Sequence, residues 1–169
     1  MENGKVRWIR MKDLVVYYSL EGNTKQAAEM IAQKLDTDIL QIETDNKIPK
    51  SNLKFFIGGM QALFRVCVKI KSLETDPEKY DRIILGTPVW AGRPAPAINT
   101  FLKKYNVKDK VTALFTCSGG GDNETCVQHL KKMLPILKTV VALADRNNPA
   151  SSGNEKRIEC FVEGLIDGR

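Results

Sequence analysis

The stretch Leu14–Ala32, LVVYYSLEGNTKQAAEMIA, changes its hydrophobic pattern partway along. It opens with Leu14–Tyr18, a continuous apolar and aromatic run that is typical of a short strand buried on both faces of a sheet. Its second half carries small and apolar residues at the spacing of one helix face. The residues between, Ser19–Thr24, are mostly polar and include a glycine. The stretch therefore predicts a strand, a polar loop and a helix in direct succession.

The same succession recurs along the chain. Five runs predict buried strands: Leu14–Tyr18, Asp38–Ile42, Arg82–Gly86, Val111–Cys117 and Thr139–Ala144. Apolar residues at helical spacing lie between most of them and after the last, and one such stripe, Val127, Leu130 and Leu134, follows Asp122, a good N-cap residue. Alternating strands and helices favour an α/β fold, with a doubly wound parallel sheet covered by helices on both faces. In such sheets ligands bind at the carboxyl ends of the strands.

The loop Ser19–Thr24 has the composition of an anion site. A helix N-terminus offers unpaired N–H groups and a partial positive charge, and Gly22 permits close approach of a ligand to the backbone. The hydroxyl and amide side chains of Ser19, Asn23 and Thr24 add donors. The loop matches neither the Walker pattern nor the dinucleotide fingerprint. Taken alone, it fits a phosphate site and an ordinary capped helix start equally well.

Two further strand ends carry unusual loops. The third predicted strand continues into Thr87–Gly92, where Trp90 lies between a proline and a glycine. This tryptophan provides either a flat surface for stacking a ring or a residue that packs beneath the loop. The fourth strand continues into Ser118–Asp122, whose three glycines allow N–H groups to approach a polar ring edge or form a flexible turn.

Together these segments, YYSLEGNT, DRIILGTPVWAGRPAPAINTFL and ALFTCSGGGD, resemble the flavodoxin-like family in their order and in following the expected strands. The resemblance covers about Asp13 to Leu165 and implies a five-stranded sheet in the order 2-1-3-4-5 with FMN as cofactor. By position it implies a phosphate loop, a loop that flanks the isoalloxazine ring and a loop at the ring's other edge. The implied cofactor-binding residues are Ser19, Glu21, Gly22, Asn23 and Thr24 in the first loop, Pro88, Val89, Trp90, Ala91 and Gly92 in the second, and Ser118, Gly119, Gly121 and Asp122 in the third.

The chain departs from the family pattern in three ways. Family members often carry a hydroxyl where Glu21 lies, and a carboxylate near a phosphate is repelled unless it points away or is neutralised. No aromatic residue occurs between Cys117 and Pro135, where flavodoxins commonly supply a tyrosine that covers the second ring face. The chain is also basic, with a net charge of +6, whereas flavodoxins are typically acidic.

The uncovered ring face favours an FMN-dependent oxidoreductase, because a nicotinamide or a quinone-like acceptor could stack there. On this hypothesis NAD(P)H reduces the flavin, which passes reducing equivalents from N5 to a small-molecule acceptor, with no catalytic side chain required. The alternatives are a non-enzymatic electron carrier reduced by a partner protein, and a binding module of the same fold that has lost FMN.

Composition narrows the class of protein. The length of 169 residues fits a basic leader, 1–12, followed by one flavodoxin-like domain, 13–169. No nucleic-acid motif accompanies the charge, no apolar run is long enough to span a membrane, and no secretory signal is evident. Four cysteines without metal-site spacing favour reduced thiols in the cytoplasm.

Three features have no role in the predicted site. The apolar segment Asn52–Ile70 predicts either a kinked core helix or a helix whose extra apolar face covers a site or meets a second copy in a homodimer. The single histidine, His129, is expected to be solvated. Cys117 is expected to be a buried strand-end thiol.

Overall fold

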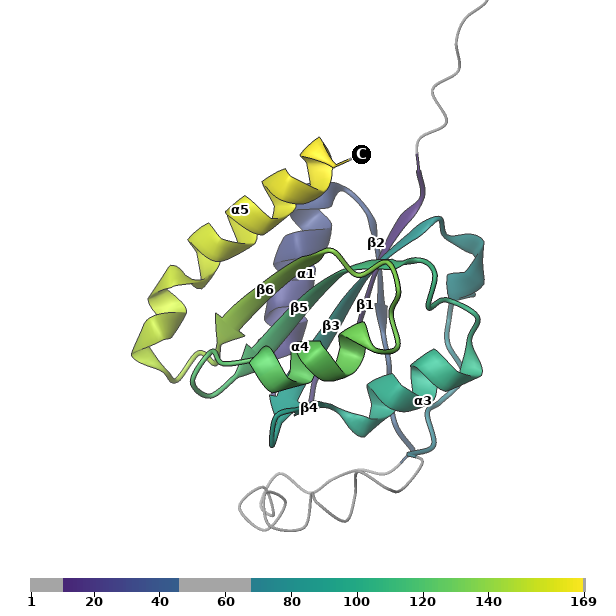
Figure 1. Ribbon diagram of the computed structural model, residues 1–169, viewed down its shortest axis with the longest axis horizontal. Helices are drawn as coiled ribbons and strands as arrows, with labels where there is room; N and C mark the ends of the chain where they lie inside the picture. The colour runs from purple at the N-terminus through teal and green to yellow at the C-terminus, as the bar shows by residue number, and fades with distance from the viewer. Residues whose placement is uncertain (1–10, 46–67, 169) are drawn as a thin grey trace, which may run out of the picture.

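Helices cover both faces of a twisted sheet (Figure 1). The computed structural model describes residues 11–45 and 68–168. Its strands are β1 (Asp13–Tyr17), β2 (Asp38–Gln41), β3 (Arg82–Trp90), β4 (Arg93–Pro94), β5 (Val111–Ser118) and β6 (Thr139–Ala144). Its helices are α1 (Asn23–Leu35), α3 (Pro96–Lys104), α4 (Glu124–Lys131) and α5 (Asn154–Asp167), with 3-10 turns η2 (Pro77–Lys79) and η3 (Pro149–Gly153).

The sheet has the order β2-β1-β3-β5-β6, and these five strands are all parallel. Counted over the parallel strands, this is the predicted 2-1-3-4-5 order, so the predicted fold class is confirmed. All five predicted parallel strands are present, and a short strand that was not predicted, β4, pairs antiparallel with the end of β3.

The extra strand corrects the prediction of a loop over Thr87–Gly92. Strand β3 runs on to Trp90, and only Ala91 and Gly92 form the turn into β4. Both turn residues have positive φ, 47° and 72°, which is the backbone geometry of the two-residue turns that match strand twist. Pro88, Val89 and Trp90, which were predicted to lie in a loop, therefore form the end of β3, the first strand of a hairpin.

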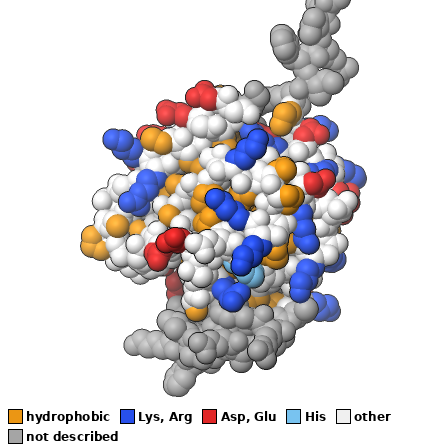
Figure 2. All heavy atoms as spheres, viewed as in Figure 1, with side chains coloured by type: hydrophobic (Ala, Val, Ile, Leu, Met, Phe, Trp, Pro, Cys, Tyr) orange, Lys and Arg blue, Asp and Glu red, His pale blue; other side chains and the backbone are white. Residues whose placement is uncertain are grey.

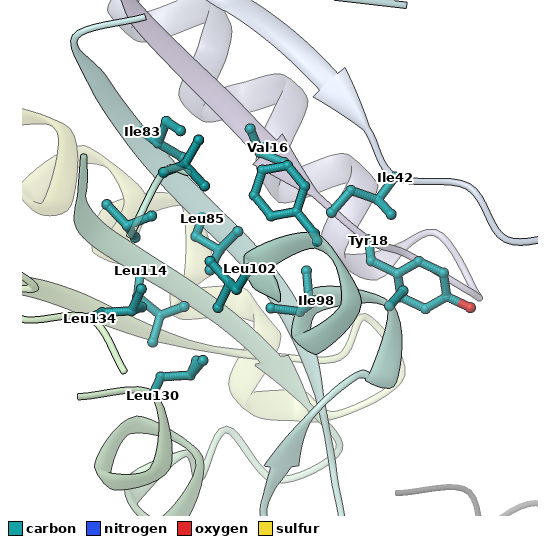
Figure 3. Packing of buried hydrophobic residues seen from close by; sticks show 14 of the residues in the cluster. Val16, Tyr18, Ile42, Ile83, Leu85, Ile98, Leu102, Leu114, Leu130 and Leu134 are labelled. Atoms are coloured by element: carbon teal, nitrogen blue, oxygen red, sulfur yellow. The ribbon is translucent and has the colours of Figure 1, made fainter. Parts of the chain in front are cut away.

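Two apolar layers form the core. On one face of the sheet, Ile98 and Leu102 of α3 and Leu130 of α4 pack against the strands, with Leu85 and Leu114 beneath them (Figure 3). On the other face, the predicted stripes of α1 and α5 pack on the remaining strand side chains. The two clusters confirm most of the inward faces that the apolar periodicity predicted, but Ile166, predicted on the inward face of α5, is 47% exposed.

Close contact between neighbouring strands requires glycine at one position. A Cβ at Gly86 of β3 would lie 2.1 Å from the ring of Phe115 on β5. No real Cβ contact is that short, so any side chain here must displace the phenylalanine.

A buried ion pair closes the opposite end of the sheet. Arg82 donates to both carboxylate oxygens of Asp13, at 2.9 and 2.6 Å, and to the carbonyl oxygen of Leu165 at 2.9 Å. Both charged side chains are almost completely buried. The pair links the starts of β1 and β3 to the end of α5, and the apolar patterns used to predict the strands gave no indication of it.

Most of Asn52–Ile70 lies outside the described residues, so both predictions for this segment stay untested. Its last residue, Ile70, is buried and forms an isolated antiparallel bridge with Thr44.

Candidate cofactor-binding site

The three predicted loops leave adjacent strands at the same edge of the sheet. Strand register aligns Tyr17 with Gly86, and Pro88 with Cys117. The loops after β1, β3 and β5 therefore begin side by side, at the carboxyl ends where parallel sheets bind ligands. The loop after β6 begins beside them, because Ser118 pairs with Ala144.

The loop after β1 ends in an open helix start. Gly22 is the N-cap of α1, with φ of +97°, and it supplies no side chain to cap the first turn. Its N–H donates to Ser19 Oγ at 3.1 Å, which fixes the curvature of the loop. The first-turn N–H groups of a helix have no intrahelical partner, so this geometry suits an anion.

Thr24 occupies a different environment from its neighbours in that loop. Its side chain is buried, and its hydroxyl forms a hydrogen bond with the Cys117 thiol. Burial raises the pKa of Cys117 to about 12, and the bond from Thr24 offsets only part of that rise. Cys117 is thus the buried strand-end thiol that was expected, while a contact of Thr24 with phosphate stays a prediction.

The loop after β6 supplies a cation that the sequence analysis did not assign. Arg146 Nη2 donates to the Glu21 carbonyl oxygen at 3.2 Å, and its backbone N–H donates to Asn23 Oδ1 at 3.3 Å. The Glu21 side chain is exposed. Burial raises the pKa of the neighbouring Asp145 carboxyl group, and the negative charge of Glu21 raises it further. The first loop is therefore hydrogen-bonded to Arg146, and its own Glu21 carboxylate acts on the Asp145 carboxylate nearby.

Trp90 is partly packed and partly accessible, and its proposed role in stacking a ring stays a prediction. It is half-buried against the core, and its ring meets Tyr18 edge-to-face with centroids 5.9 Å apart. Its partner Tyr18 is buried, which raises the pKa of that phenol. The tyrosine fixes one edge of the indole while part of the tryptophan remains accessible at the rim of the site.

A hydroxyl stabilises the base of the β3–β4 hairpin. Thr87 Oγ1 accepts from the Ala95 N–H at 3.0 Å and donates to the Pro88 carbonyl at 2.9 Å. At the tip, a Cβ on Gly92 would lie 3.3 Å from Thr125, so the hairpin rests directly on α4. The hairpin that carries Pro88, Val89 and Trp90 is thereby held in one position.

The third loop is shaped by its glycines. Gly121 has φ of +78°, and Ser118 Oγ donates to the Asp122 carbonyl at 3.0 Å. Gly119 and Gly120 are exposed, and a Cβ on either would meet nothing within 4 Å. The Gly119 carbonyl accepts from Asn148 Nδ2 at 2.7 Å, which links this loop to the one after β6.

The prediction of Asp122 as the N-cap of α4 is wrong by one residue. The N-cap is Asn123, whose Nδ2 donates to Thr116 Oγ1 at 2.9 Å instead of capping the helix. Asp122 Oδ1 accepts the Glu124 N–H at 3.1 Å, so it still stabilises the first turn.

His129 is not fully solvated, which corrects the sequence prediction in part. The ring is half-buried, with Nδ1 3.2 Å from Nη1 of Arg93 on β4. Burial, followed by the positive charges of Arg93 and Lys132, lowers the pKa of His129.

The described thiols Cys117, Cys126 and Cys160 are all free. Among residues 11–45 and 68–168, no group of three or more His, Cys, Asp or Glu side chains is arranged to hold a metal ion. No helix in the described part of the chain is long and apolar enough to cross a membrane.

Comparison with known proteins agrees with the fold. The flavodoxin family model matches residues 12–148. A candidate flavoprotein from Bacteroides eggerthii is 26% identical with a TM-score of 0.75, over 92% of this chain and 98% of that one. A flavoprotein from Lactobacillus acidophilus, solved in complex with FMN, is 27% identical with a TM-score of 0.63, over 87% and 98%.

An uncharacterised protein of Archaeoglobus fulgidus is 26% identical over 68% of this chain and 71% of its own length. The parallel sheet with strand order β2-β1-β3-β5-β6, covered by helices on both faces, is the fold of the flavodoxin-like class. The chain is a member of the flavodoxin family, as the sequence resemblance predicted.

Proposed function

We propose that this chain binds FMN and transfers reducing equivalents from NAD(P)H to a quinone-like or other small-molecule acceptor. Family membership and the FMN complex of the Lactobacillus acidophilus flavoprotein support FMN as the cofactor. Within this chain, the three adjacent strand-end loops support the same assignment.

The residues present fit a phosphate-bearing cofactor. Gly22 leaves the first turn of α1 open to an anion, and the backbone can reach it without interference from a Cβ. The carboxylate of Glu21 would repel a phosphate, but its side chain is exposed and Arg146 is hydrogen-bonded to its backbone. The guanidinium would offset part of the negative charge that Glu21 and Asp145 bring to this loop.

The protein would position the ring by its second and third loops. Trp90, fixed by Tyr18, provides an apolar wall, and the hairpin turn at Ala91 and Gly92 presents backbone N–H groups next to it. Bound FMN supplies hydride acceptance at N5 and electron transfer, so the chain needs no acid or base of its own.

The observation that carries the oxidoreductase assignment is the open third loop. Gly119 and Gly120 have empty space beside them, and no aromatic residue occurs between Cys117 and Pro135. A second planar ligand could therefore reach the ring face on that side. Stacking of donor and acceptor rings is the arrangement that direct hydride transfer requires.

The charge distribution favours a second candidate function, electron transfer between proteins. Residues 91–140 contain eight Lys and Arg against three Asp and Glu, which is +5 of the formal net charge of +6. Positive charge in this segment would attract an acidic redox partner where it reaches the surface.

Anaerobic stopped-flow mixing separates the two functions. Protein reconstituted with FMN is mixed with NADPH or NADH, and the visible flavin absorbance is followed. Rapid bleaching by either nucleotide supports the oxidoreductase. If neither nucleotide bleaches the flavin while a reductase protein does, the chain is a carrier. If no yellow complex forms with added FMN, both functions are excluded.

A further inference from the structure

We propose that Arg93 and His129 form an anion site at the rim of the cofactor site, which takes a phosphate group of the nicotinamide dinucleotide. The inference rests on the proposed oxidoreductase function and specifies how its second substrate is held. It is argued from the contact between the two side chains, their surroundings and their position relative to Trp90.

The contact defines the protonation state of the histidine. A guanidinium has hydrogen-bond donors and no acceptor, so Nδ1 of His129 must accept the bond from Arg93 Nη1 at 3.2 Å. The ring is therefore neutral in this arrangement, with its proton on Nε2. A cation held against a neutral imidazole leaves the positive charge of Arg93 uncompensated at this contact.

Two positive charges act on the His129 ring. Arg93 reaches it from β4, and Lys132 follows the end of α4, which carries the histidine. Both charges disfavour protonation of His129. The nearest acid on the same helix, Glu124, interacts with Gln128. Figure 2 shows Lys and Arg side chains on both sides of His129 on this face.

A bound phosphate would neutralise the positive charge at this position. An anion between the two side chains would accept from the guanidinium and from a protonated imidazole, with the extra proton taken up from solvent. Charge-assisted hydrogen bonds of this kind are shorter and stronger than neutral ones. The positive charges of Arg93 and Lys132 would also raise the local concentration of an anionic substrate.

The position connects this pair to the reaction site. Arg93 is the direct cross-strand partner of Trp90, and Gly92 rests on Thr125 of α4 one turn before His129. Arg93 and Trp90 therefore lie on the same hairpin, and this hairpin contacts the helix that carries His129. A dinucleotide whose nicotinamide lies on the open ring face could fold back so that a phosphate reaches the rim.

The single histidine of the chain makes a direct test possible, because every imidazole NMR signal comes from His129. The FMN-loaded protein is titrated with acid and base in the presence of NADP+, NAD+ or inorganic phosphate. We expect the dinucleotides to raise the pKa of His129 by about one unit or more, as an opposite charge at contact distance does. A shift with NADP+ alone identifies the 2′-phosphate, and an equal shift with NAD+ identifies the pyrophosphate.

Substitutions of Arg93 and of a control lysine test the second residue of the site, with the His129 NMR signal reporting dinucleotide binding. Arg93→Gln should weaken dinucleotide binding about tenfold, the loss of roughly one charge-assisted hydrogen bond. Lys103→Gln removes an equal charge from the last turn of α3 and should change the affinity less than about twofold. Equal losses in the two variants would show a general field effect and overturn the site.

Two other outcomes would also overturn it. An unchanged His129 pKa with both dinucleotides excludes contact, and an equal shift with inorganic phosphate at the same concentration excludes recognition of the dinucleotide. The proposed function fails separately, if a dinucleotide binds and shifts His129 but its reduced form does not bleach the flavin.

Discussion

Arg146 donates a hydrogen bond to the carbonyl oxygen of Glu21 at 3.2 Å, although the two residues are 125 positions apart in the sequence. The bond places a guanidinium at the loop where an FMN phosphate is proposed to bind. In the proposed function the positive charge of Arg146 would offset part of the repulsion between the Glu21 carboxylate and the phosphate.

Replacing Arg146 with Gln should weaken FMN binding about tenfold, because a charge-assisted contact contributes about 1.5–3 kcal/mol. Calorimetric titration of the apo-protein measures this change. The matched control is Arg157→Gln, which removes an exposed charge from α5 and should leave the affinity unchanged. Equal effects of the two substitutions would show that Arg146 acts only through net charge.

Trp90→Ala should alter the absorbance and fluorescence of bound flavin while the protein stays folded, because the residue is only half-buried. Trp90→Phe keeps a planar surface and should retain most of the bound spectrum. Spectra of the three FMN complexes, recorded at saturation, make the comparison. A flavin spectrum that is the same in all three would place Trp90 away from the ring.

Gly86→Ala should destabilise the fold by about 1–3 kcal/mol, because its Cβ would overlap the Phe115 ring. Gly164→Ala is the opposite case, since it lies inside α5 with nothing within 4 Å of its Cβ. That substitution should stabilise the protein by about 0.5–1 kcal/mol through helix propensity. Urea unfolding measures both, and a neutral Gly86→Ala would refute the close contact between β3 and β5.

Asp13→Asn should lower the free energy of unfolding by about 3–5 kcal/mol, because it leaves the buried Arg82 guanidinium without a counter-charge. The exposed pair Glu43 and Lys71 is the comparison, with 2.7 Å between its charged atoms. Glu43→Gln should lower the free energy of unfolding far less, because solvent screens an exposed pair. A small effect at Asp13 in urea unfolding would mean that solvent reaches Arg82.

Alkylation should separate the described thiols by their environment. Burial raises the pKa of both Cys117 and Cys126 to about 12, so about one in ten thousand of either is thiolate at pH 8. Cys160 is exposed on α5. Iodoacetamide treatment at pH 8 with peptide mapping should find Cys160 modified first, and Cys117 and Cys126 only after unfolding. Equal labelling of all three thiols in the native protein would contradict the burial of Cys117 and Cys126.

The fold could be predicted because its determinants are local. Continuous apolar runs gave the five parallel strands, and the stripe around Ile31 gave the inward face of α1. Glycines at Gly22 and Gly121 marked positions that adopt positive φ. Where local rules competed, the prediction failed: Pro88 and Gly92 suggested a loop, but pairing with β5 and a two-residue turn extended β3 into a hairpin.

The sequence by itself determined the succession of strands, loops and helices, because periodicity and turn residues act over a few positions. It also determined that the first and fourth predicted strands run into loops rich in polar residues and glycine. Only the tertiary structure decided which distant side chains meet there: Arg146 beside Glu21, Tyr18 against Trp90, and Arg93 against His129. These pairs depend on strand order and on how the loops and helices pack, which no local pattern encodes.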